Sequence, residues 1–525
     1  MQKSNIWLLA RFVIKRNKFL LMVWFALPVL LIISTIASFT GLFSAPEAVN
    51  EMVRDSMSNN VIVGMHGPIL DSSLGGITAW RQRVMLVLFV GIFSMVFINK
   101  NTRKEEESGR YMLLGANVVG HNTLLNVNLI IAFITNLLAG IFVAIGAIGM
   151  GLEATGSFSL GLSIASGGCF MAALTSLVAQ LTESASKVNM WVITILGLFF
   201  ILNFASNLNP DNDFIAWLSP FTWTIVARPY AGETWLILIY AIAVTAVLTC
   251  LSYYFHGKRD SGAAIFGISS GKPHASPGFR NPMALGWRLH KGIFSGWLVG
   301  FSLIAVLLGG VAKGMVRLVG DNPQMLEWME KFGGDDNAFV AVILYVISLN
   351  LSAYIILSVS KLRIEETNGL AQLLLSTPVK RMQWLFSHLV YALLGSLVIL
   401  LVFGFLTGLI HGLNTGDVGY QVSTLVGQAM AKVPAVWVVA GISLLLFGWL
   451  PKFSTAISWT LFAAFILLEL FWETGNVSDT LFALSPFSHV HPIQNITIFT
   501  MAGLLSFSLL TLFLGMIGFQ RRDLE

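Results

Sequence analysis

The residues of this chain best placed to do chemistry form one charged motif that occurs twice. Residues 103–119 read RKEEESGRYMLLGANVV, and residues 363–379 read RIEETNGLAQLLLSTPV. Carboxylates beside an arginine form charge-assisted hydrogen bonds, either with bases of the same chain or with an external protein. The copies align without a gap, which indicates a tandem duplication. The identical positions are Arg103, Glu105, Glu106, Gly109, Leu113, Leu114 and Val119 in the first copy, and Arg363, Glu365, Glu366, Gly369, Leu373, Leu374 and Val379 in the second.

The elements that must position this motif are membrane spans. Hydrophobic residues make up 56% of the chain and charged residues only 11%, whereas a soluble protein carries about 25% charge. The mean hydropathy is +0.78. A helix needs about 20 apolar residues to cross a bilayer. Twelve runs are predicted to do so, at residues 19–41, 83–99, 122–150, 157–182, 189–207, 232–255, 293–312, 338–359, 384–410, 434–450, 454–472 and 495–518.

The spans divide into two halves of six. Residues 1–255 form the first half, residues 256–284 a linker rich in Gly, Ser and Pro, and residues 285–525 the second half. Each half begins with a basic, aromatic stretch, near Trp7 and near Trp287, which is typical of a helix lying at a membrane surface. An even number of spans makes the two repeats parallel. We therefore predict an all-α integral membrane protein with twelve transmembrane helices in two parallel six-helix repeats.

The basic residues predict the orientation in the membrane. About three quarters of the 31 Lys and Arg residues fall on one side if both termini face the cytoplasm, as the positive-inside rule requires. The sequence pI near 9.1 therefore reflects topology, and no nucleic-acid partner is expected. Membrane lipid is the expected surrounding.

The chain lacks the motifs of an enzyme or a metal site. Residues 267–273 (GISSGKP) are the nearest approach to a phosphate-binding loop, but their spacing is wrong and a proline ends them. We predict that the chain does not hydrolyse ATP and holds no cofactor or metal. Cys169 and Cys250 lie in apolar runs, which indicates no disulfide framework. His489 and His491 are predicted to be ordinary surface residues.

Glu469 is the clearest charged residue inside a predicted span. Burying such a charge costs at least about 2.5–3.5 kcal/mol, so intramembrane charges mark transport paths or internal pairs. One interpretation is a carboxylate that reaches the outer interface and pairs with a neighbouring span. The other is a residue that lines the transport path. Because the other spans are almost free of charge, the energy for transport is expected to come from a partner.

Each copy of the charged motif is predicted to form a short acidic helix on the cytoplasmic side, over residues 103–114 and 363–375. A solvated loop would explain one copy, but it would not explain why a second copy keeps the same residues in register. A docking or mechanical role is therefore favoured. Two further features recur in the same order: Leu218 to Phe221 (LSPF) repeats at Leu484 to Phe487, and Arg259-Asp260 repeats at Arg522-Asp523.

These features together resemble the ABC-2-type exporter permeases, over essentially the whole chain. Two such halves in one chain resemble the bacterial permeases of antibiotic exporters of the tetronasin and polyether type. The resemblance implies a coupling helix in each motif, which would bind a separate P-loop ATPase through Arg103, Glu105, Glu106 and Gly109 and through Arg363, Glu365, Glu366 and Gly369. It also implies two ATPase copies that bind ATP and Mg, a hydrophobic or amphipathic substrate, and a bacterial cell membrane.

Two other functional classes remain as alternatives. An ion-coupled secondary transporter would require ionisable groups within the spans, and few are present. A membrane enzyme such as a lipid-linked transferase would require acidic or histidine clusters at one interface, and none converge in the sequence.

Overall fold

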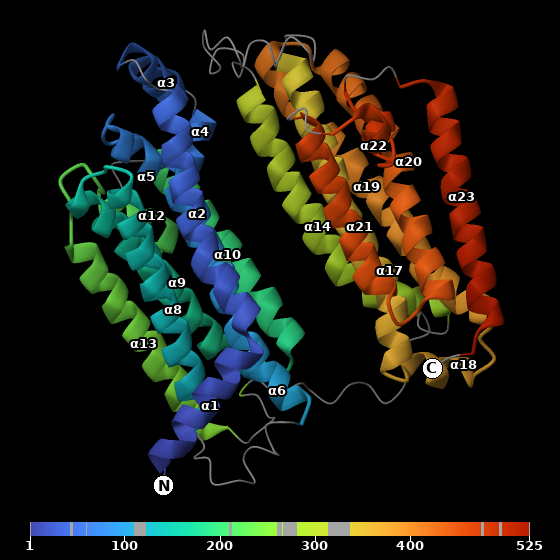
Figure 1. Cartoon of the computed structure of the whole chain (residues 1–525), viewed down its shortest axis with the longest axis horizontal. Coiled ribbons are helices and arrows are strands. Elements are labelled where there is room, and N and C mark those ends of the chain that lie inside the picture. The colour runs from blue at the N-terminus through green and yellow to red at the C-terminus, as the bar shows by residue number, and fades with distance from the viewer. Residues whose placement is uncertain are drawn as a thin grey trace. The chain divides into compact units, whose positions relative to one another are not determined.

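The structure is a computed structural model, in which residues 2–42, 46–58, 60–109, 122–208, 213–259, 265, 281–312, 336–473, 477–492 and 496–523 are described. The chain forms two compact units, Met1–Gly271 and Lys272–Glu525, each with its own hydrophobic core (Figure 1). The described residues form helices and no strand. The predicted all-α class is confirmed.

Unit 1 is built around long helices that run side by side (Figure 1). Its described helices are α1 (Gln2–Arg16), α2 (Lys18–Leu42), α3 (Pro46–Ser58), α4 (Asn60–His66), α5 (Leu74–Asn101), α6 (Arg103–Glu107), α8 (Thr123–Gly149), α9 (Ala154–Leu181), α10 (Ala185–Leu208), α11 (Asp213–Leu218), α12 (Pro220–Val226) and α13 (Leu236–Lys258).

Unit 2 has the same general construction. Its described helices are α14 (Pro282–Ala312), α17 (Asp336–Thr367), α18 (Leu370–Leu375), α19 (Arg381–Thr415), α20 (Val418–Trp449), α21 (Ser454–Glu473), α22 (Asp479–Phe482), the 3₁₀ turn η2 (Ser488–Val490) and α23 (Ile498–Arg521). The short helix α18 lies at the end of the unit where the C-terminus is found (Figure 1).

Eleven helices in the described part of the chain are long and apolar enough to cross a membrane. They coincide with eleven of the twelve predicted spans. The remaining one, at residues 454–472, corresponds to α21 (Ser454–Glu473), an apolar helix of 20 residues, of which Ser454–Glu469 is found as a shorter apolar helix. The chain is a multi-pass membrane protein.

Local sequence signals explain where several of these helices begin. Ser73, Asp417 and Thr497 each precede a helix, and each side chain accepts a hydrogen bond from a backbone N–H of the first turn. Such caps satisfy donors that would otherwise have no partner. Glycine then allows close helix packing, since a Cβ on Gly140 of α8 would lie 2.3 Å from the carbonyl oxygen of Gly161 of α9.

The two predicted interfacial helices differ from each other. In unit 1 the basic stretch is a separate helix, α1, which ends at Arg16, and Asn17 divides it from α2. In unit 2 the stretch around Trp287 is the beginning of α14, a continuous helix of 31 residues. No proline follows Trp287 in this stretch, and the helix continues through Gly292. Most of the predicted linker, residues 256–284, lies outside the described residues.

Candidate functional site: the charged motif at one end of each unit

The charged motif lies at the end of the second long helix of each unit, an arrangement that differs from the predicted separate loop helix. In unit 1, Thr102 separates α5 from the five-residue helix α6, Arg103–Glu107. In unit 2, residues 363–367 are the last part of α17 itself. The acidic residues favour helix and contain no breaker, so the span simply continues through them. In unit 2 the leucines of the second copy form a separate helix, α18. Residues 110–114, the rest of the helix predicted in the first copy, lie outside the described residues.

A glycine at the same motif position ends this acidic segment in both units. Gly109 has a φ of 71° and Gly369 a φ of 73°, the left-handed conformation that glycine adopts without steric cost. A Cβ at either position would meet nothing within 4 Å. These glycines therefore serve the turn.

Glu106 is held between two arginines inside unit 1. Its carboxylate accepts two hydrogen bonds from Arg259, at 2.5 and 2.8 Å, and one from Arg103 at 2.6 Å. The side chains of Glu106, Arg259 and Arg103 are only 4%, 3% and 1% exposed. The two-pronged contact from Arg259 is the strongest form of such a pair, because both N–H groups meet both carboxylate oxygens.

Glu366 repeats this arrangement in unit 2. Its carboxylate accepts hydrogen bonds from Arg522 at 2.5 and 2.9 Å, and one from Arg363 at 3.3 Å. Glu366 is fully buried, whereas the side chains of Arg522 and Arg363 are 14% and 17% exposed. The arginines of the second cluster are therefore more accessible to solvent than those of the first.

The arginine partners come from the end of the last long helix of each unit. Arg259 follows α13 directly and Arg522 follows α23 directly, and both have extended backbones as the C-caps of those helices. Their sequence distances from the glutamates are 153 and 156 residues. The sequence showed both arginines as a recurring pair but did not show that they contact the motif. Each cluster ties the end of the second long helix to the end of the last one.

The other acids of the first copy bind further elements of unit 1. Glu105 lies 3.0 Å from the guanidinium of Arg16, at the end of α1. Glu107 accepts a hydrogen bond of 2.7 Å from the backbone N–H of Ala185, at the beginning of α10, where a negative charge also complements the helix dipole. The motif therefore contacts α1, α10 and the end of α13.

The second copy leaves more of its surface exposed. Glu365 is half-buried, one helical turn after Lys361, and Thr367 stands where the first copy has Glu107. Leu370 and Leu373 of α18 are exposed, with 68% of Leu373 accessible. The acids were predicted either to pair with bases of the same chain or to dock an external protein, and the central glutamate of each copy pairs within its own unit. The exposed side chains of α18 in unit 2 are leucines.

Glu469 occupies a second buried polar cluster, at the opposite end of unit 2. The hydroxyl of Tyr345 on α17 donates to Glu469 Oε2, and His491 Nε2 lies 3.3 Å from Glu469 Oε1. Glu469 therefore pairs with a neighbouring span, as the first of the two predicted interpretations holds. The prediction that His491 is a surface residue is wrong, because His491 is buried against Glu469, Tyr345 and Trp472.

Lys432 of α20 completes this outer cluster. Its ammonium group donates to the carbonyl of Val490 and lies 5.7 Å from the ring centre of Tyr345. Lys432 is buried, a position that sequence reasoning did not single out because the predicted span begins only at residue 434, whereas α20 begins at Val418. In the part of the chain that the structure describes, no group of three or more His, Cys, Asp or Glu residues is placed to hold a metal ion.

Comparison with known proteins gives two related matches. Residues 279–520 match the family model described as the C-terminal domain of the multidrug efflux system permease Rv1217c. The chain is also 32% identical, over 466 residues, to the multidrug efflux system permease protein Rv1217c of Mycobacterium tuberculosis (strain ATCC 25618 / H37Rv). That alignment covers 88% of this chain and 84% of the relative.

Proposed function

This chain belongs to the family of multidrug efflux system permeases that includes Rv1217c, and on this premise we propose that it is the membrane subunit of an ATP-driven exporter of the ABC-2 type. The observation that carries the proposal is the pairing of Glu106 with Arg259 and of Glu366 with Arg522. A permease that receives its energy from a separate subunit needs a rigid connection between the surface that contacts this subunit and the helices that must move. Each pairing is such a connection.

A separate ATPase is the proposed source of energy, with one copy at the motif end of each unit. ATP and Mg would be bound by that partner and not by this chain. In unit 2 the exposed leucines of α18, Leu370 and Leu373, offer the apolar contact that a protein interface is centred on. In unit 1 the exposed charges are Lys104 and Glu107. The two contacts are therefore proposed to be unequal.

The motif ends of both units are proposed to face the cytoplasm, where ATP is available. This orientation agrees with the distribution of basic residues along the chain. The chain would then lie in a bacterial cell membrane with both termini on the cytoplasmic side. The substrate is proposed to be a hydrophobic or amphipathic, antibiotic-like compound, because the relative carries the description of a multidrug efflux system and the spans of this chain are predominantly apolar.

Co-purification with an ATPase tests this proposal. The purified chain alone should release no phosphate from ATP, and activity should arise when a P-loop ATPase encoded beside it is co-expressed. Leu373→Asp should abolish association and export. The matched control is Leu413→Asp on α19, because Leu413 is 63% exposed and lies at the end of unit 2 away from the motif. Phosphate release by the chain alone, or equal association of both variants, would exclude the proposed coupling.

A second candidate is an ion-coupled secondary transporter. Within the spans, Lys432 and Glu469 are buried, and His290 Nε2 lies 3.0 Å from His388 Nδ1 in another buried contact. These groups are more numerous than the sequence suggested, and buried ionisable groups are typical of proton-driven transport. The two candidates are separated by export measured after collapse of the proton gradient with an uncoupler. Export that continues while ATP is present supports the ATP-driven exporter, and export that stops at constant ATP supports the secondary transporter.

A further inference from the structure

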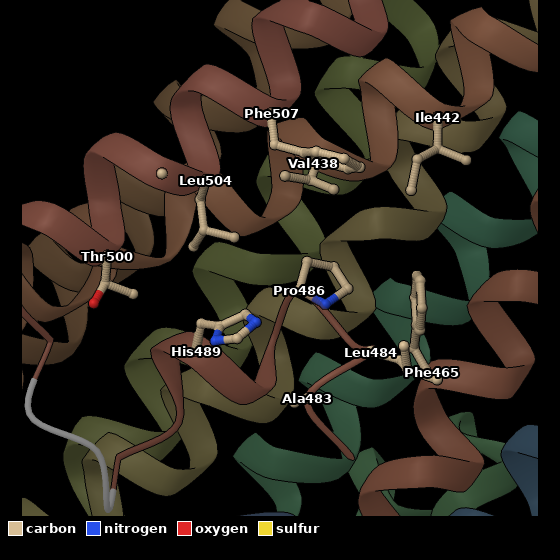
Figure 2. Close-up of a pocket in the computed structure, with 11 residues that line it drawn as sticks. Val438, Ile442, Phe465, Ala483, Leu484, Pro486, His489, Thr500, Leu504 and Phe507 are labelled. Carbon is tan, nitrogen blue, oxygen red and sulfur yellow. The ribbon is translucent and has the colours of Figure 1, made fainter. Parts of the chain in front are cut away.

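Unit 2 contains a pocket of about 580 Å³ on the side of α20 that lies between α21 and α23. Val438 and Ile442 of α20 and Phe465 of α21 form part of its wall. The segment 483–489, which precedes α23, lines the rest of the pocket with α23 (Figure 2). Pockets for drug-sized ligands have volumes of about 300–1,000 Å³, so this one is large enough for a whole small molecule.

At Gly503, α23 contributes no side chain to the pocket. Gly503 lines the pocket, and a Cβ at this position would meet no atom within 4 Å. The floor residues Val438 and Phe465 are buried, whereas Leu484 and Phe507 at the rim are exposed. A compound can therefore reach buried apolar surface from outside unit 2.

Aromatic rings and a single imidazole set the chemistry of the lining. Phe465 of α21 and Phe507 of α23 contribute aromatic faces, which pack well against flat apolar molecules. His489 is oriented towards Leu504 and Thr500 across the pocket (Figure 2). Its side chain makes no hydrogen bond to any residue that the structure describes, so the imidazole can bind a polar group of a ligand.

The chain segment that carries His489 is fixed by buried residues on either side of it. Phe487 is fully buried, and His491 packs on Tyr345 and contacts Glu469 in the outer cluster. The two histidines thus have different roles, because His491 fixes the segment while His489 faces the pocket. A preorganised polar group of this kind is what orients a ligand in an otherwise apolar site.

We infer that this pocket binds a flat, hydrophobic, drug-sized compound, with His489 as the hydrogen-bonding partner of one polar group on the compound. The inference rests on the proposed function, since it assigns a binding site for the class of substrate that the permease is proposed to export. A lipid acyl chain is a less suitable occupant, because it is flexible and has no hydrogen-bonding group along its length to use His489.

Photolabelling of the whole chain in lipid nanodiscs tests the inference. The probes are a diazirine-bearing naphthol and a diazirine-bearing phosphatidylcholine, and the labelled peptides are identified by mass spectrometry. The naphthol should label segment 483–489 and α23. Gly503→Trp should fill the pocket and reduce this labelling by roughly tenfold or more, a loss of at least about 1.4 kcal/mol in binding. The matched control is Gly296→Trp on α14, where a Cβ also meets nothing within 4 Å.

Variants of His489 test the polar contact separately. His489→Phe should reduce labelling by the naphthol but not by the corresponding diazirine-bearing naphthalene, and His489→Gln should restore labelling by the naphthol. The inference is overturned if Gly503→Trp and wild type label equally with the naphthol, or if only the phosphatidylcholine probe labels the segment. Failure of the proposed function is a different result: loss of the chain would then leave drug accumulation in cells unchanged.

Discussion

Neutralising Glu106 is the sharpest test of the connection between the motif and the last helix of unit 1. Arg259 and Arg103 both donate to the same oxygen, Glu106 Oε2, at 2.8 and 2.6 Å. In Glu106→Gln these two buried guanidinium groups remain close together, but the negative charge that balances their mutual repulsion is gone. Gln180 accepts from Arg259 at 2.6 Å, but it is neutral and does not replace the carboxylate.

The magnitude follows from burial. Removing one partner of a fully buried ion pair costs about 3–5 kcal/mol, and all three side chains of this cluster are nearly inaccessible. That cost corresponds to a shift of roughly two to three and a half powers of ten in the equilibrium for local opening. In Glu366→Gln the cost should be lower, about 1.5–3 kcal/mol, because Arg522 and Arg363 can reach water.

Hydrogen exchange measured by mass spectrometry on the protein in nanodiscs is the assay. Peptides covering residues 100–109 and 252–259 should lose protection in Glu106→Gln, and export should fall with them. For the exchange measurement the matched control is Lys104→Gln, since Lys104 belongs to the same motif, is exposed, and its substitution also changes the net charge by one unit. Exchange in Glu106→Gln within about twofold of wild type would refute the idea that this carboxylate holds the two helix ends together.

Two further predictions concern single residues of unit 2. Gly369→Val should destabilise the turn by about 1–2 kcal/mol, because φ is 73° and a side chain is strained there, whereas Gly369→Asn should be milder; equal thermal stability of the two variants would contradict this reason. Glu469→Gln should leave export within about twofold of wild type, because Tyr345 and His491 hold the residue inside the unit and a neutral amide still accepts from Tyr345. A tenfold loss of export at unchanged stability would instead place Glu469 on the transport path.

The membrane class and most of the spans were predictable from sequence, because the bilayer imposes a length and an apolar composition that a single chain displays directly. The presence and the position of the charged motif were also predictable from sequence. Its two copies could be compared with each other, so the shared residues stood out. Comparing the two copies could not show which residues the motif side chains contact. The acids were expected to pair either with bases of the same chain or with an external protein, and the structure pairs Glu106 and Glu366 with arginines of the same unit.

Two other residues of unit 2 were also misjudged from sequence because their partners are distant along the chain. His491 was interpreted as a surface residue because no carboxylate is near it in sequence, yet α21 brings Glu469 to within 3.3 Å of its ring. Lys432 lay just outside the span predicted at 434–450, and its partner, the carbonyl of Val490, is 58 residues away. Charge pairing decides whether such a group is tolerated in an apolar interior, and pairing depends on distance in space.

The sequence by itself therefore determined the all-helical membrane class, the places of the eleven long apolar helices found in the described part of the chain, and the positions of both charged motifs, because hydropathy and repetition are local properties of a chain. Only the tertiary structure decided that Arg259 and Arg522 meet those motifs, and that the leucines of α18, not the central glutamates, are exposed in unit 2. It also decided that α20, α21 and α23 leave a pocket beside His489. These results depend on how helices pack, and packing brings together residues more than 50 or even 150 positions apart.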